Sequence, residues 1–186
     1  MNLYLNNAQW SSILNLTDES TLPYISSLIP VAVMRISSAT ASFHRYHIFC
    51  IDFLEKCLYI SDGTEIIDSY LSFGICQIIK NTFVKFPNNS NAHIHLSRLL
   101  KTMLAREELS EYVLDEIIPF ACEFIINRDN IILSAFSWNL IKMFEETLES
   151  SYVLSLVPED VIDQMNNINN LLDNEYGGPA PKADAP

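Results

Sequence analysis

The chain has 186 residues, of which 49% are hydrophobic and 18% charged, a composition typical of a packed globular domain. Its four glycines leave no phosphate-binding glycine-rich loop, no nucleophile elbow and no glycine-rich turn set for a β-sandwich. The formal net charge of −12 falls entirely within residues 106–186, which hold sixteen acidic and four basic residues. A surface of that sign repels phosphate backbones and anionic leaflets, so we expect neither nucleic acid nor a membrane as a partner.

The N-terminal segment has neither a positive start nor an apolar core, so no signal peptide is predicted. The longest apolar run, Leu28 to Met34, is far shorter than the roughly 20 residues that a membrane span requires. Four cysteines are spread along the chain and are expected to be reduced core residues: Cys50, Cys57, Cys76 and Cys122. These features together predict a cytoplasmic protein.

Apolar residues recur with the 3.6-residue period of an α-helix in five successive segments, namely 43–58, 75–86, 96–104, 113–125 and 133–148. The predicted start signals are Ser42, Thr64, Ser90 and Ser110 as N-caps, and Pro158 in the first turn of a last helix. The predicted stops are Asp62–Gly63, Phe86–Asn89 and Asn127–Asp129. Pro30 and Pro119 should each begin or kink a helix. The pattern predicts seven or eight helices of roughly 12–20 residues.

Short links between these helices favour antiparallel neighbours. The helix pair recurs at roughly 40–47 residues, which is the period of HEAT and armadillo repeats. We therefore predict an all-α, HEAT/armadillo-like stack of antiparallel helix pairs over residues 1–173, with a closed helical bundle as the alternative. Residues 174–186, which contain Gly177, Gly178 and prolines, are predicted to be a flexible tail.

Histidines and a cysteine in the first predicted helix invite a metal interpretation. His44 and Cys50 diverge by about 120° around a helix axis, whereas a metal needs converging ligands. His47 and Cys50 lie on the apolar stripe and are better explained as a core histidine and a core thiol. His93 and His95 follow a helix start and are expected to form capping or inter-helix hydrogen bonds.

Two acidic clusters could supply carboxylates for acid–base catalysis, Glu107–Glu108 with Glu111 and Glu145–Glu146 with Glu149. Both lie on the polar side of amphipathic helices, where solvated carboxylates are the expected state. No serine–histidine–aspartate arrangement stands out, so no catalytic, cofactor or metal residue is predicted and the protein is not expected to be an enzyme. The remaining enzymatic alternative is a small metal-dependent helical enzyme that uses His44, His47 or His93.

Two segments carry a resemblance to a known family, residues 42–58 and the stretch from Leu71 to His93. They resemble the SAPS domain, which is found in the Sit4-associated regulatory subunits of protein phosphatase 6, and the match extends over residues 40–172. The matching positions are Arg45, Leu71, Gly74, Ile75, Phe83, Phe86, Pro87, Asn89 and His93. The resemblance implies the later part of a family domain and a non-catalytic regulatory subunit that binds a phosphatase catalytic subunit.

The matching positions also have structural explanations. Gly74 either lets two helices approach or permits a break between short helices. Phe86 to Asn89 form a helix stop and a turn, and His93 is expected to bond across the helix pair. The residues expected to contact a partner protein are Arg45, Phe86, Pro87, Asn89 and His93, with the acidic Glu107, Glu108 and Glu111. An adaptor for another complex, with a basic peptide in its groove, is the alternative within the same class.

Overall fold

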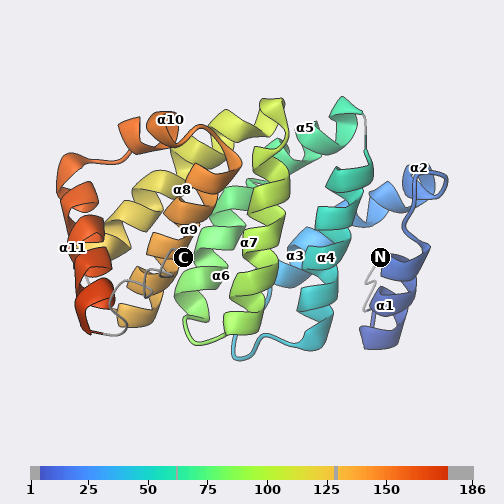
Figure 1. The fold of residues 1–186 in the computed structure, drawn as a ribbon. Helices are drawn as coiled ribbons and strands as arrows, with labels where there is room; N and C mark the ends of the chain where they lie inside the picture. The colour runs from blue at the N-terminus through green and yellow to red at the C-terminus, as the bar shows by residue number, and fades with distance from the viewer. Residues whose placement is uncertain (1–4, 62, 128–129, 176–186) are drawn as a thin grey trace, which may run out of the picture. The chain divides into compact units, whose positions relative to one another are not determined.

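The computed structural model describes residues 5–61, 63–127 and 130–175, and all regular structure in these ranges is helical (Figure 1). The described elements are α1 (Asn7–Leu16), α2 (Leu22–Ile25), the 3-10 helix η1 (Ser26–Leu28), α3 (Ile29–Ser37), α4 (Arg45–Ile60), α5 (Thr64–Ser72), α6 (Ile75–Lys85), α7 (Ser90–Leu104), α8 (Glu107–Asn127), α9 (Ile131–Thr147), α10 (Ser150–Ser155) and α11 (Glu159–Glu175). The all-α prediction is confirmed. The predicted number of helices is too small, because α2 and α10 are shorter than a periodic pattern can reveal.

The chain divides into two compact units, residues 1–118 and 119–186. The boundary falls inside α8, which runs on through Pro119, so no helix begins at this proline. Pro30 lies in the first turn of α3, where its missing N–H costs no hydrogen bond, and the prediction that a helix begins there is confirmed. In the described part of the chain, no helix combines the length and apolar character needed to cross a membrane.

In the first unit, α1 packs against α4, and the residues in contact lie 42 or 43 positions apart in the sequence. The Trp10 ring, which is fully buried, lies 5.7 Å from the ring of Phe53, 43 positions later. One helical turn on, the Lys56 ammonium donates a hydrogen bond of 3.1 Å to the backbone carbonyl of Leu14, 42 positions earlier. Because both numbers increase together, the two helices run in the same direction.

The same separation relates α4 to α7. The Asp52 carboxylate pairs with Nδ1 of His95, and the Glu55 carboxylate lies 2.8 Å from the Arg98 guanidinium, each 43 positions apart. The helices α1, α4 and α7 are therefore equivalent members of successive rungs and lie side by side (Figure 1). The separation of 43 residues lies within the predicted period of HEAT and armadillo repeats.

A second layer is formed by α3 and α6, which also pack on each other (Figure 1). Residues 38–44 connect α3 to α4, and the turn Phe86–Asn89 connects α6 to α7. Two helix pairs, α3/α4 and α6/α7, thus stack on each other as rungs. The predicted stack of helix pairs is confirmed in this unit.

Helix starts depart from the prediction by one to four residues. Ser42 and Ser110 are wrong as N-caps: the cap of α4 is His44, and α8 begins at Glu107, three residues before Ser110. Acidic side chains in the first turn of α8 favour the earlier start, because they complement the positive end of the helix dipole. Thr64 and Ser90 are first helical residues, and the caps are the residues before them.

Gly74 separates α5 from α6 and has a left-handed backbone conformation, with φ 60°. A Cβ atom added there would meet nothing within 4 Å, so no close approach of helices requires a glycine. Of the two predicted explanations, the break between short helices is correct, because only glycine adopts this conformation without strain.

The predicted apolar stripes form the core. All four cysteines are free and buried, as predicted, and burial raises the pKa of each thiol, to about 12 for Cys57 and Cys76. Tyr70 is fully buried between α5 and α4, where its hydroxyl donates a 2.6 Å hydrogen bond to the Leu54 carbonyl. Burial of that phenol, which disfavours its charged form, raises its pKa well above the usual value.

The second unit contains the end of α8 with α9, α10 and α11, and α9 packs on α10. The Asn130 side chain begins α9 by accepting hydrogen bonds of 3.1 Å from the backbone N–H groups of Ile132 and Leu133. The last helix extends to Glu175, two residues into the predicted tail. The rest of that tail, residues 176–186, and the predicted stop residues Asp62, Arg128 and Asp129 lie outside the described residues.

Candidate functional site

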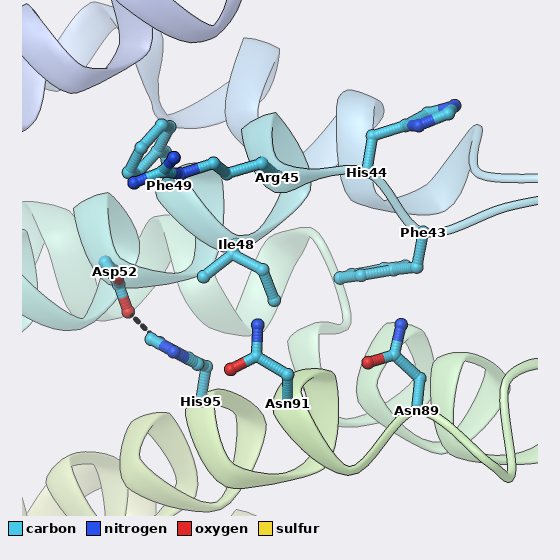
Figure 2. A pocket seen from close by; sticks show the side chains of 9 residues that line it. All are labelled: Phe43, His44, Arg45, Ile48, Phe49, Asp52, Asn89, Asn91 and His95. Carbon is cyan, nitrogen blue, oxygen red and sulfur yellow. Dashed lines mark hydrogen bonds and ion pairs between the residues drawn. The ribbon is translucent and has the colours of Figure 1, made fainter.

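The first half of α4, the residues before it and the first turns of α7 border a pocket of about 470 Å³ (Figure 2). It lies within the first unit, between two successive rungs of the stack. Its lining is Phe43, His44, Arg45, Ile48, Phe49, Asp52, Asn89, Asn91 and His95.

The pocket lining includes the pair Asp52–His95, drawn as a dashed line in Figure 2. Each of these side chains is 18% exposed. The pair ties α4 to α7, which fixes the spacing of the two helices that form the pocket walls. Its first role is therefore structural.

Two amide side chains point from α7 towards α4 (Figure 2). The Asn89 oxygen caps α7 by accepting a 3.0 Å hydrogen bond from the N–H of Ala92, which leaves the NH₂ group of Asn89 as a donor. Asn91 is exposed, and within the described ranges its amide has no hydrogen-bond partner. The pocket wall thus offers amide groups that are available to another molecule.

Arg45 lies on the α4 side of the pocket. Its guanidinium carbon is 5.4 Å from the centroid of the Phe49 ring, and the side chain is exposed. Among the described residues no carboxylate pairs with it. In Figure 2, Ile48 lies between this cation–aromatic pair and the α7 amides, and His44 points away from the other lining residues.

A second pocket, of about 450 Å³, adjoins the first and is formed by the turn between α6 and α7, residues 85–91. Both pockets are lined by Asn89 and Asn91, so they are adjacent. We call the two pockets together the α4–α7 groove. Lys85 lines its second pocket, with the ammonium 6.0 Å from the Phe86 ring centroid.

The turn at the second pocket is held by a hydrogen bond from His93, a buried side chain that is 4% exposed. Its Nε2 lies 3.1 Å from the Phe86 carbonyl oxygen, and its ring meets Phe83 edge-on with centroids 5.3 Å apart. Burial lowers the pKa of His93, and the neutral ring donates its Nε2–H to the carbonyl. The predicted bond across the helix pair is confirmed.

His47 is buried beside the start of α4, with 1% of its surface exposed. Its Nδ1 accepts a 2.8 Å hydrogen bond from the N–H of His44. Burial, with further contributions from His44 and Arg35, lowers the pKa of His47 to about 4. The predicted core histidine and the core thiol of Cys50 are both confirmed.

The structure places the predicted partner-binding residues in two regions. Four of them line the α4–α7 groove, namely Arg45, Phe86, Pro87 and Asn89, and His93 supports the groove from below. The acidic residues Glu107, Glu108 and Glu111 are exposed on the first turns of α8 and line neither pocket of the groove. We call these three residues the α8 acidic turn. In the described part of the chain, no group of three or more histidine, cysteine or acidic side chains is placed to hold a metal ion.

Sequence reasoning did not single out Asp52, Asn91 or Phe49 as groove residues. The signal was present in the repeat period, since an acidic residue and a histidine or arginine recur at one separation, Asp52 with His95 and Glu55 with Arg98. A search for such pairs at 40–47 residues would have aligned α4 with α7 and brought their first turns together.

Comparisons of the chain with protein-family models, with curated proteins and with solved structures found no match.

Proposed function

We propose that this chain is a non-catalytic regulatory or scaffold protein that binds a partner protein through the α4–α7 groove. The observation that carries the proposal is that four predicted contact residues line two adjacent pockets that share Asn89 and Asn91. The SAPS resemblance adds the identity of the partner, which we propose to be the catalytic subunit of protein phosphatase 6.

The groove is suited to protein recognition for a physical reason. Most of its polar groups stand on α4 and α7, which are linked by the Asp52–His95 and Glu55–Arg98 pairs, and the turn before α7 is held by the buried His93. A partner that docks there does not have to order a mobile surface first, so little of its binding energy is lost to entropy. Aromatic and arginine side chains such as Phe86 and Arg45 are the types that dominate protein interfaces.

The α8 acidic turn has a second role in this proposal. Its exposed carboxylates lie on α8 and line neither pocket of the groove, which suits long-range attraction of a basic partner surface better than tight contact. We expect salt to weaken this contribution strongly, because the Debye length is about 8 Å at physiological ionic strength.

The test is binding of the purified catalytic subunit to the immobilised full chain. We expect saturable binding that Arg45→Glu weakens by about fivefold, because the substitution reverses a charge at the groove. Lys101→Glu is the matched control, because Lys101 is exposed on α7 and lines neither pocket. Absence of saturable binding would overturn the phosphatase proposal, and equal weakening by both variants would place the contact outside the groove.

An adaptor for a different complex is the second candidate, and the 43-residue rungs of α1, α4 and α7 favour it. Such stacks present extended surfaces to many kinds of partner. Saturable binding of a basic peptide to the same immobilised chain, with no binding of the catalytic subunit, would select this candidate.

A further inference from the structure

We propose that the α4–α7 groove binds an extended acidic peptide segment of the partner protein. The peptide backbone would bond to the amides of Asn89 and Asn91, and an aspartate or glutamate side chain would pair with Arg45. This inference rests on the proposed function as a protein-binding scaffold, and it specifies the chemistry of the bound segment.

The charges that line the groove determine which charge a bound ligand should carry. Arg45 lines the first pocket and Lys85 the second, and neither has a carboxylate partner among the described residues. Asp52 is the one acidic side chain among the described residues that line the two pockets, and His95 already engages its carboxylate. An incoming carboxylate therefore finds two unpaired cations, whereas an incoming lysine or arginine finds a single acid, Asp52, which already has a hydrogen-bond partner.

The net charge of the whole chain does not reverse this conclusion. The excess of acidic residues lies in residues 106–186, while residues 1–105, which contain the whole groove, hold equal numbers of acidic and basic side chains. At physiological salt, charges beyond about 8 Å are largely screened. The cations that line the groove thus dominate the field that a bound peptide experiences.

The amides favour a peptide over a small anion. An asparagine side chain carries the same donor and acceptor groups as a peptide bond, so it can bond to the backbone of an extended segment whatever its sequence. Asn89 contributes its free NH₂ group and Asn91 its whole amide. Since these residues line both pockets, a backbone bound to them would pass from one pocket into the other.

The apolar residues of the groove would contact the rest of such a peptide segment. Phe43 and Ile48 line the first pocket beside the amides, and Phe49 lies under the Arg45 guanidinium (Figure 2). A carboxylate at Arg45 would meet a cation whose other face is covered by an aromatic ring, which reduces its hydration and strengthens the pair. Alternate side chains of the peptide would face Ile48 and solvent.

The test uses the full chain and fluorescently labelled peptides of about eight residues, long enough to span roughly 27 Å when extended. One random-sequence pool contains glutamate at alternate positions, and matched pools contain glutamine or lysine there. We expect the glutamate pool to bind tightest and the lysine pool weakest in fluorescence anisotropy, with the preference reduced by salt. Equal binding of the glutamate and glutamine pools, or a preference for lysine, would overturn the inference.

Two variants separate the roles of charge and amide. Arg45→Gln should reduce binding of the glutamate pool about threefold to fivefold and leave the glutamine pool unchanged, since an exposed ion pair contributes modestly. Asn91→Ala should weaken both pools, because the backbone contact is lost whatever the side chains. Lys101→Gln is the control with the same change of charge outside the groove, and an effect of this variant equal to that of Arg45→Gln would contradict the site.

This experiment is independent of the phosphatase test. If the catalytic subunit binds but no acidic preference is found, the inference fails and the proposed function stands. If acidic peptides bind as described and the catalytic subunit does not, the phosphatase proposal fails and the groove chemistry stands.

Discussion

The α4–α7 groove and the α8 acidic turn differ in how many elements build them. The groove combines side chains from α4, α6 and α7 and from two connecting segments, held by the Asp52–His95 hydrogen bond and a buried histidine. The α8 acidic turn consists of three exposed carboxylates on one helix. We therefore expect the two regions to act differently on a partner protein. Exposed charges on one helix should attract a partner of opposite charge, whereas selective binding needs groups that several elements hold in position.

The largest expected effect is on acid stability and concerns His47, whose buried ring packs against Phe43 of the groove lining, whereas the carboxylates of the α8 acidic turn are exposed. The pKa of His47 is lowered to about 4 in the folded state by burial, so the unfolded chain binds a proton more readily. The free energy of unfolding should therefore fall as the pH drops below about 6.5, by about 3 kcal/mol at pH 4. Urea unfolding from pH 7 to pH 4 measures this loss.

His47→Gln removes the titrating group and should flatten this pH dependence by that amount. Glu111→Gln, in the α8 acidic turn, should retain the native dependence. An unchanged pH profile in His47→Gln would show that other groups cause the acid sensitivity.

The second expected effect concerns the Asp52–His95 pair, which lines the groove. Asp52 and His95 are each mostly buried and bridge successive rungs, so a double-mutant cycle with Asp52→Asn and His95→Gln should give a coupling of about 1 kcal/mol. The same substitutions should weaken peptide binding, because the spacing of α4 and α7 is no longer fixed. A coupling near zero would mean that the apolar core alone sets the spacing.

The smallest expected effect is in the α8 acidic turn. Replacing Glu107, Glu108 and Glu111 together by glutamine should slow association with the catalytic subunit by a factor of about two to three and leave dissociation unchanged, because rim charges steer encounters. Stopped-flow or biosensor kinetics at low and physiological salt would measure both rates. A large increase in the dissociation rate would instead place these carboxylates in the interface.

The fold could be predicted further than the site. Apolar periodicity places the core positions of the long helices, and it predicts the repeat period because burial acts on every residue of a stripe. Helix starts were less predictable: Ser42 has the usual residue type for a cap, yet α4 begins three residues later, where the His47 ring accepts the N–H of His44. Cap choice depends on such tertiary contacts as well as on local preference.

The groove could be predicted only in part, because its composition also depends on tertiary contacts. Arg45, Phe86, Pro87 and Asn89 were identified through a family resemblance, but Asp52 and Asn91 join them only when α4 and α7 lie side by side. The adjacency of α4 and α7 results from the stacking of the rungs and cannot be deduced from the sequence of either helix alone.

The most direct measurement is hydrogen–deuterium exchange of the full chain with and without the phosphatase catalytic subunit. Binding at the groove should slow exchange in residues 43–52 and 85–95, with little change in residues 107–116. Slowed exchange confined to residues 107–116, or no change in any of these segments on addition of saturating catalytic subunit, would contradict the assignment of the groove as the binding site.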